Sequence, residues 1–447
     1  MNKILCALSA AAMLLTVPAG AMDLSLNKTV QMIQKESQDL QKADMNVKKA
    51  RAGLDSVNSN RWFQISGSAT YMKLVNVENP SKPFGFAIPA DVAGMAAMSG
   101  VPAGALPAFI EFPDNIGMVG ATINQPIYTF GKIGNAADSA RAAIHMAESG
   151  KDIAGREVAY AAAQIYWTAK MTDGMVAVAQ RNLNDSYAAR KQLESVARPS
   201  KANLVKISAD IASNEVSLSD AQFNRDSAYR LLKVMAGIDE NESITLTDNF
   251  PDSFGALNTP KKLESNPEWD MLSRQAEMFD AQRHAAHAGW YPTLGATASY
   301  NYIAMNNDYK LWNGTKNQSA YWGLSLSVPI FDGGLNRANA TTAAMNAESA
   351  RLDLDKSKKM KSNEYTDAVL KYDHLRNSLG QLKTARDLAA RAAQISNDRF
   401  AAGQASAVEL ADVQSALAQM DMAVLNSKFN IVMAMESIKK LSANSSQ

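Results

Sequence analysis

Four short segments of the chain alternate regularly between apolar and polar residues, as the run from Phe63 to Tyr71 illustrates. This alternation is the period of a β-strand with one apolar face and one face in contact with water. It predicts strands over residues 62–73, 116–128, 291–302 and 319–331. Each is about long enough to cross a bilayer at a tilt.

Most of the remaining chain follows the helical period. Helices are expected over 22–60, 134–198 and 201–236, and again over 266–289, 336–402 and 406–441. The helices 134–198 and 336–402 are unusually long, because neither contains a proline; at about 1.5 Å per residue each spans on the order of 100 Å. Apolar residues recur in 336–402 at steps of three and four, which is the spacing of a coiled-coil seam.

The order of these elements occurs twice. Gln-Pro-Ile-Tyr-Thr-Phe-Gly over 125–131 returns as Val-Pro-Ile-Phe-Asp-Gly-Gly over 328–334, each time between a strand and a long helix. We therefore expect a duplication with repeats 22–236 and 266–441, an irregular linker over 237–265 and a disordered tail over 442–447. The strand-to-helix turns are expected to depend on Pro126, Gly131, Pro329, Gly333 and Gly334.

The two loops between paired strands differ in composition. Residues 74–115 are rich in Pro, Gly and Ala, whereas 303–318 are shorter and polar. Both are predicted to be irregular. The role of the longer loop does not follow from its sequence.

Charge and composition exclude several classes of function. The chain has 45 basic and 44 acidic residues among 447, so it lacks the basic excess that nucleic-acid binding requires. Of the 4 histidines, only His284 and His287 could share a helix face, and no third ligand is apparent. We expect no metal, no cofactor and no enzymatic activity, because no nucleophile motif or phosphate-binding loop is present.

The first residues have the pattern of a secretory signal peptide. Lys3 precedes an uncharged apolar run, and the small residues Ala19-Gly20-Ala21 follow it. Residues 1–21 are therefore expected to be removed. The only cysteine, Cys6, lies within this segment, so the mature chain would be stabilised by packing without disulfides. No later run is long and apolar enough for a membrane helix.

Four membrane strands in one chain leave two open sheet edges. Unpaired backbone groups in hydrocarbon cost several kcal/mol each, so strands from several copies must close a common barrel. Two copies would give a barrel filled by side chains, and three or more would leave a pore.

The duplicated strand pairs ending in Pro-Ile-aromatic, together with the turn Arg-Phe-Ala-Ala-Gly-Gln-Ala-Ser over 399–406, resemble the TolC family of outer membrane efflux ducts. The resemblance covers nearly the whole mature chain and implies a mainly α-helical protein with a small β part. It implies a homotrimer, with a twelve-stranded barrel in the outer membrane lipid of a Gram-negative bacterium and a helical barrel of coiled-coil hairpins in the periplasm. It further implies a passive exit duct of a tripartite efflux or type I secretion system, with a periplasmic adaptor and an inner membrane transporter as partners.

The resemblance also implies a periplasmic constriction. The matching carboxylates are Glu409 and Asp412, which share one helix face. Ser406 and Glu409 also form a possible capping box, so a purely structural role for Glu409 stays open. The first repeat has Asn203 and Lys206 at the corresponding positions, and we hypothesise that Lys206 pairs with Asp412 and helps to keep the entrance closed.

The two turns at this end are small and nearly uncharged, and the resemblance implies that they contact the adaptor. These tip residues are Ala197, Arg198, Pro199, Ser200, Phe400, Gly403, Gln404, Ala405 and Ser406. The same residues would serve equally well in ordinary tight turns.

A second class of function remains possible from the sequence. A structural or surface-receptor coiled coil anchored by a small β-barrel would have similar helices. A duct additionally needs a polar inner strand face, which Ser66, Thr122 and Ser325 would supply. The transported substrate, the pump and adaptor served, the ion selectivity and the gating mechanism leave no signal in the sequence.

Overall fold

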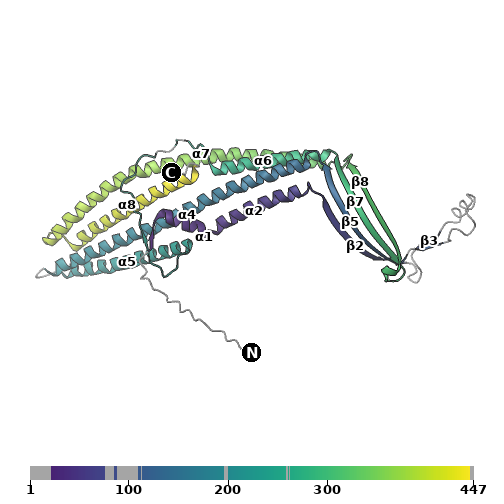
Figure 1. The fold of residues 1–447 in the computed structure, drawn as a ribbon. Coiled ribbons are helices and arrows are strands. Elements are labelled where there is room, and N and C mark those ends of the chain that lie inside the picture. Colours follow the sequence, from purple (N-terminus) through teal and green to yellow (C-terminus); the bar gives the residue numbers. More distant parts are fainter. Residues whose placement is uncertain are drawn as a thin grey trace, which may run out of the picture. The chain divides into compact units, whose positions relative to one another are not determined.

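The computed structural model describes residues 22–75, 85–87, 109–111, 113–195, 200–257, 260 and 262–442 (Figure 1). The chain divides into two compact units. One is helical and comprises Met1–Lys48, His145–Ser273 and Arg351–Gln447. The other contains the main sheet and comprises Lys49–Ile144 and Arg274–Ala350. The expected signal peptide lies outside the described residues.

Two very long helices dominate the structure, namely α4 (Lys132–Glu194) and α7 (Leu335–Ala401). Each is followed by a shorter helix, α5 (Lys201–Ala236) or α8 (Ala407–Leu441), that returns alongside it (Figure 1). Helix α5 ends at Gly237, whose left-handed backbone (φ 66°) favours glycine and lets its N–H bond the last helical carbonyls.

The segment 22–60, expected to be one helix, is interrupted twice. Residues Met22–Leu24 form strand β1, and Ser25 then caps helix α1 (Leu26–Glu36) by accepting a bond from the Lys28 N–H. Ser37 has an extended backbone, and helix α2 (Gln38–Ser59) begins after it. The prediction of an unbroken helix was wrong, because Met22–Leu24 pair in parallel with β6 (Ile244–Leu246) and the extended backbone of Ser37 separates α1 from α2.

The linker over 237–265 is therefore not wholly irregular, since it contains β6. It is tied to both long helices by buried tyrosines. The Tyr166 hydroxyl donates to Asp248 Oδ2 at 2.9 Å and lies 3.2 Å from the Leu24 carbonyl oxygen. The Tyr372 hydroxyl donates to the Gly255 carbonyl at 2.8 Å. Burial raises the pKa of Tyr166 to about 12, so this phenol stays neutral and able to donate.

Apolar clusters of the helical unit surround these ties. One cluster packs Leu24, Ile33, Tyr166 and Leu232, and another packs Tyr365, Tyr372 and Ile431. A third, at the far end of the hairpins, is formed by Leu183, Ile207, Phe400, Ala407 and Leu410. The stability of this unit thus comes from apolar packing along the helices, as the lack of disulfides requires.

The second unit contains a four-stranded antiparallel sheet in the order β2-β5-β7-β8. The strands are β2 (Gln64–Lys73), β5 (Asn115–Tyr128), β7 (Thr293–Asn306) and β8 (Thr315–Ser327). Two connections precede β7, namely helix α6 (Pro267–His287) and the 3-10 turn η1 (Ala288–Trp290).

Strand ends differ from the expected bounds. Strands β7 and β8 extend into the predicted loop 303–318, with only the short turn η2 (Leu311–Asn313) between them. Strand β8 ends at Ser327, before the expected 331, because its partner β7 begins at Thr293, directly opposite. Within the other predicted loop, β3 (Gly85–Ala87) pairs with β4 (Phe109–Glu111).

Both strand-to-helix turns depend on backbone conformations that glycine favours. Gly131 has φ 85° beside Phe130 at φ 48°, and Gly333 and Gly334 have φ 65° and 91°. Pro126 lies at an irregularity in the pairing of β5 with β7, where a residue without an N–H is tolerated. In the described part of the chain, no helix is apolar and long enough to cross a membrane.

Candidate functional site

The main sheet has one apolar face and one polar face, and the strand register aligns both across all four strands. Residues directly paired across strands lie on the same face. On the apolar face, one row is Ile65, Ile123, Ala298 and Trp322, and the next is Gly67, Ala121, Tyr300 and Ala320. On the polar face, the corresponding rows are Ser66, Thr122, Ser299 and Tyr321, and Gln64, Asn124, Thr297 and Gly323.

Polar side chains on this face bond to one another across strands. Thr122 Oγ1 lies 3.1 Å from Ser299 Oγ, and Thr297 Oγ1 donates to Asn124 Oδ1 at 2.9 Å. Asn301 Nδ2 donates to Ser299 Oγ at 3.2 Å. Uncharged hydroxyl and amide groups of this kind suit a surface that faces water.

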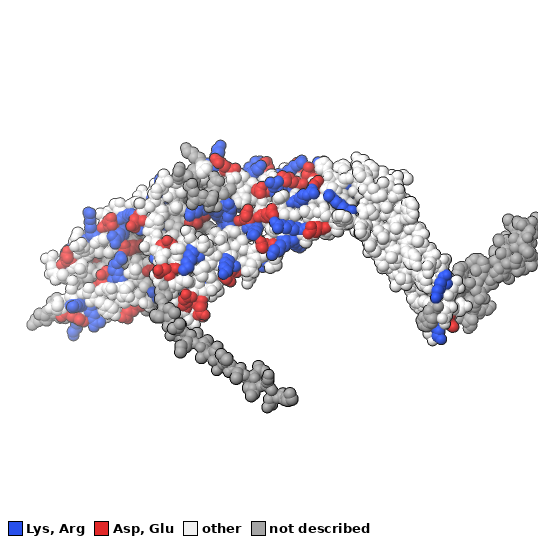
Figure 2. Space-filling view, viewed as in Figure 1, with Lys and Arg blue, Asp and Glu red and all other residues white. Residues whose placement is uncertain are grey.

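The sheet is almost free of charge. Lys73 and Lys316 are the only charged residues in its four strands. Lys73 is the last residue of β2, and Lys316 lies near the start of β8, just after η2. Figure 2 shows the visible sheet surface largely without Lys, Arg, Asp or Glu, whereas both signs of charge are spread over the helices. Meanwhile Trp322 and Leu324 are 84% and 68% exposed on the apolar face.

The α7–α8 turn places the predicted carboxylates at the start of α8. Ser406 caps this helix, and its Oγ accepts from the Glu409 N–H at 3.1 Å. The Glu409 carboxylate does not complete a capping box but accepts from Arg399 Nη1 at 2.7 Å. Gly403, with φ 74°, turns the chain, and the Gln404 N–H donates to the Arg399 carbonyl at 2.8 Å. Arg399 lies in the turn 399–406 that carries the resemblance but was not among the predicted tip residues.

The predicted residues of the first repeat contact this turn. Asn203 Oδ1 accepts from the Ala407 N–H at 3.4 Å, which links the start of α5 to the start of α8. Lys206 Nζ pairs with Asp210 at 2.6 Å within the described chain, and the hypothesised pair of Lys206 with Asp412 stays a prediction for the assembled tips. Lys206 and Asp412 do line a common polar pocket. The i, i+4 spacing of Lys206 and Asp210 was the signal that could have identified this pair.

The tip residues differ in accessibility. Phe400 is 6% exposed and belongs to the apolar cluster of the tip, so it holds the turn together from inside. Ser200, Gly403, Gln404 and Ser406 are exposed, and Ala405 is half-buried. Ala197, Arg198 and Pro199 lie outside the described residues.

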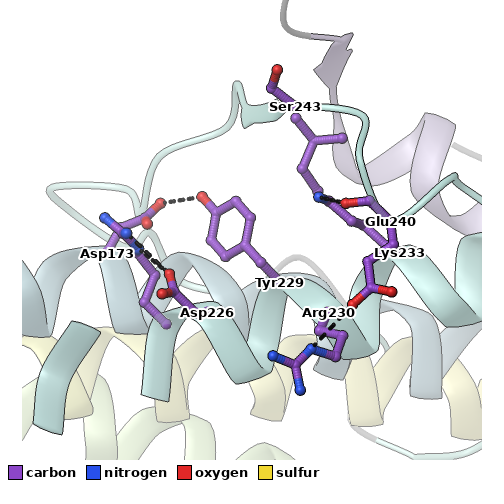
Figure 3. A pocket seen from close by; sticks show the side chains of 9 residues that line it. Asp173, Asp226, Tyr229, Arg230, Lys233, Glu240 and Ser243 are labelled. Carbon is purple, nitrogen blue, oxygen red and sulfur yellow. Dashed lines mark hydrogen bonds and ion pairs between the residues drawn. The ribbon is translucent and has the colours of Figure 1, made fainter. Parts of the chain in front are cut away.

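A pocket in the helical unit lies between α4, α5 and the linker (Figure 3). Several of its polar groups already have partners within the chain: the Tyr229 hydroxyl donates to Asp173 Oδ2 at 2.8 Å, and Arg225 donates to Asp226 at 3.0 Å. Lys233 Nζ donates to the Glu240 carbonyl at 2.8 Å. Burial and then the bond to Asp173 raise the pKa of Tyr229. We assign this pocket no ligand, and in the described residues no group of His, Cys, Asp or Glu is placed to hold a metal ion.

A chain with long helical hairpins and a small, nearly uncharged sheet has the architecture of a TolC-like channel protein. The solved structures of the same fold include CusC, with a TM-score of 0.74, 15% identity and coverage of 93% of this chain and 92% of that one. They also include the Campylobacter jejuni channel CmeC, with a TM-score of 0.73, 16% identity and coverage of 93% and 85%. At such identities the likeness concerns the fold.

Sequence comparison matches the second part of the chain to a protein family. Residues 260–444 match the profile of the outer membrane efflux protein family. The outer membrane protein OprJ of Pseudomonas aeruginosa is 25% identical over 162 residues, which cover 36% of this chain and 33% of OprJ. The nickel and cobalt resistance protein CnrC of Cupriavidus metallidurans is 25% identical over 203 residues, which cover 44% of this chain and 46% of CnrC. The chain spans less than half the length of either relative in these matches.

The match over residues 260–444 agrees with the resemblance found in the sequence. The mainly helical fold with a small sheet is thereby confirmed.

Proposed function

We propose that three copies of this chain form an exit duct across the outer membrane, with their sheets closing a twelve-stranded barrel and their helices forming a periplasmic tube. The duct conducts substrates passively. An inner membrane transporter and a periplasmic adaptor deliver them to it, as in a tripartite efflux or type I secretion system.

The sheet carries this proposal. Its edge strands β2 and β8 each have a partner on one side only among the described strands, so the sheet is open at both edges. Its apolar face is suited to lipid, and its polar rows are suited to a water-filled lumen. Open edges cannot be accommodated in hydrocarbon, and closure by further copies pairs their backbone groups.

The helical unit offers a matching pair of surfaces. On α5, four exposed apolar residues recur after whole helical turns; they are Val205, Val216, Phe223 and Val234. On α7, Leu370, Leu388 and Ile395 form a similar exposed stripe, each about 60% exposed. Such stripes are typical of coiled-coil seams, and we propose that the α5 stripe of one copy packs on the α7 stripe of the next.

The alternative, a surface receptor or structural coiled coil with a small barrel anchor, gives no reason for aligned polar rows in the sheet. A filled anchor would bury these positions and favour apolar side chains in them. The polar face thus favours a duct.

The two halves of the chain are proposed to derive from a duplication, with repeats 22–236 and 266–441. The alignment that pairs Ser200 with Ser406 also pairs Tyr166 with Tyr372, and both tyrosines bond the linker between the repeats. Both serines cap the return helices.

At the tip, we propose that Glu409 and Asp412, with Asn203 and Lys206, line the periplasmic constriction. Three copies would bring three Asp412 carboxylates around one axis, which attracts cations. Replacing Asp412 by Asn should shift the reversal potential in a salt gradient toward zero. An unchanged reversal potential would show that Asp412 does not line the constriction.

The exposed tip residues are proposed to contact the adaptor. A photo-crosslinking residue at Gln404 should capture the adaptor in the native envelope. The matched control places the same residue at Asn317 in β8, which the adaptor should not reach. Equal capture at both positions, or none at Gln404, would contradict this contact.

The direct test of the duct combines mass and conductance. Native mass spectrometry of the purified protein should give three copies, and the same preparation should form stable ion-conducting pores in planar lipid bilayers. A monomer, or a trimer that does not conduct, would contradict the proposal. Co-purification from the native envelope then identifies the transporter and adaptor.

A further inference from the structure

A second cavity differs from the one in Figure 3 because it is mostly apolar and lies on the polar face of the sheet, where the strands meet the helices. We call it the junction pocket; among its lining residues are Val57, Asn124, Lys132, Ile133, Thr297 and Ser325. All belong to the sheet unit, so the pocket is complete within one compact part of one chain. It encloses about 540 Å³, which is enough for a drug-sized molecule.

The walls of the junction pocket offer two kinds of contact. Val57 from α2 and Ile133 from α4 supply apolar surface. Asn124 and Thr297 supply polar groups, already fixed in place by their mutual bond of 2.9 Å. Gln125 is held by bonds from its Nε2 to the Arg61 and Pro126 carbonyls, at 2.9 and 2.7 Å, which fixes the wall where β5 ends.

One charge lines the junction pocket, and it is positive. Lys132 is part of the lining, and no Asp or Glu is. Within the described part of the chain, no carboxylate lies within ion-pair distance of the Lys132 ammonium group. An anion placed in the pocket would therefore meet an ammonium group that has no competing acidic partner.

At the corresponding junction of the second repeat, the pocket lining does contain a carboxylate. Its pocket, of about 240 Å³, is lined by both Asp332 and Arg337. Asp332 accepts bonds from the Gly334 and Asn336 N–H groups at 2.9 and 2.8 Å, so it serves the turn itself. Of the two junctions, only the first is therefore expected to prefer anions.

We propose that the junction pocket is a binding subsite for amphipathic organic anions, molecules with an apolar ring body and one sulfonate or carboxylate group. Val57 and Ile133 contact the apolar body, Lys132 pairs with the anionic group, and the Asn124–Thr297 row borders the polar edge. The placement of this subsite along a transport path rests on the duct proposed above.

Two fluorescent probes test the charge preference. They are 1-anilinonaphthalene-8-sulfonate and its uncharged relative N-phenyl-1-naphthylamine, titrated against the full-length protein in lipid nanodiscs after subtraction of empty nanodiscs. Lys132→Gln should weaken binding of the sulfonate by about tenfold, the order expected for one hydrogen bond to a charged group. Binding of the uncharged probe should not change. Lys316→Gln, at the other end of the sheet, is the control and should leave both affinities unchanged.

A pair of glycine variants tests the location. A Cβ at Gly295, which lines the pocket, would lie 3.5 Å from Ser325 Oγ and 3.6 Å from the Gln125 carbonyl, which are ordinary contacts. Gly295→Leu should therefore fold, occupy the pocket and abolish binding of both probes. Gly323→Leu, where nothing lies within 4 Å, is the control on the same face of the sheet and should bind normally.

The subsite is contradicted if Lys132→Gln binds the sulfonate as tightly as the unaltered protein, or if Gly295→Leu binds both probes. Because each pocket lies within one chain, these results do not depend on conductance. Normal conductance with unaltered probe binding in the variants would overturn the subsite alone. Absent conductance with the predicted binding differences would overturn the duct while supporting the subsite.

Discussion

The main sheet and the helical unit differ in their content of charged residues. The four strands contain only Lys73 and Lys316, both near strand ends, and expose large apolar side chains. The helices carry charges throughout and pair many of them, as in the contacts of Asp421 with Arg181 at 2.7 Å and with Arg386 at 2.8 Å. The two regions therefore present different surfaces, as expected if the sheet of the proposed duct lies in lipid and the helices lie in water.

The difference also indicates where stability originates. Exposed ion pairs contribute little, so the many pairs on the helices chiefly maintain solubility. Helix packing and the buried tyrosine ties to the linker hold that unit together. Among the described residues, the clusters of buried apolar side chains all belong to the helical unit, whereas the apolar face of the sheet is largely exposed.

Adding a charge to the apolar face should have the largest effect. Ala320→Arg places a guanidinium near the middle of β8 on this face and should destabilise the membrane-inserted protein by about 2–4 kcal/mol per chain. Ser319→Arg is the matched control, because Ser319 is the adjacent residue on the polar face. The readout is the fraction of heat-resistant oligomer formed on folding into lipid vesicles. Similar losses from both variants would mean that the two faces share one environment.

In the helical unit, loss of a buried tyrosine hydrogen bond to the linker should have the next largest effect on stability. Tyr166→Phe removes the acceptor of the Asp248 N–H and a donor to the Asp248 carboxylate, and should cost about 1–3 kcal/mol. Tyr372→Phe removes one bond to the Gly255 carbonyl and should cost about 1 kcal/mol. Urea unfolding followed by the helical circular dichroism signal measures both. A smaller effect for Tyr166 than for Tyr372 would refute the account of the linker.

Removing an exposed charge from the helices should matter much less. Arg399→Gln breaks the pair with Glu409, whose side chains are 49% and 43% exposed, and should cost less than about 1 kcal/mol. The same urea unfolding applies. Lys359→Gln, which breaks an exposed pair with Asp355 within α7, provides the comparison. A loss as large as that of Tyr166→Phe would show that surface pairs hold the tip.

The smallest effect is expected at Asp185 in α4, and it has the opposite sign. Burial raises the pKa of this carboxyl, with Arg181 partly opposing the shift. Its ionised form therefore destabilises the folded state at neutral pH, and this penalty disappears as the pH falls through the raised pKa and the group is protonated. Asp185→Asn should raise the unfolding midpoint at pH 7 and leave it unchanged at pH 3.

Asp152→Asn, at an exposed position of the same helix, is the control for this pH dependence. It should leave the midpoint unchanged at both pH values. An Asp185→Asn variant that is less stable at pH 7 would show that the carboxylate has a stabilising role.

The sequence predicted the elements that depend on local periodicity. Alternation marked the four strands, and the long proline-free segments marked α4 and α7. What it missed depends on tertiary contacts. The pairing of β1 with β6 joins two three-residue strands distant in the chain, and no local pattern signals such a partner. The end of β8 at Ser327 is likewise set by where β7 begins.

Site residues divide in the same way. Ser406 was correctly expected to cap a helix, because capping is local. The pairing of Arg399 with Glu409 crosses a turn, and the bond from the Ala407 N–H to Asn203 joins two repeats, so neither could be inferred from spacing. Phe400 is buried because the tip has its own apolar cluster, which the sequence does not reveal.

The central claim is that the sheet separates lipid from water, and cysteine accessibility along β8 tests it most directly. Cys6 is the only cysteine of the sequence, so single cysteines can be introduced in a Cys6→Ser background. In lipid vesicles, a water-soluble maleimide should label positions 319, 321 and 323 and spare 320, 322 and 324. Equal labelling of all six positions would contradict the claim.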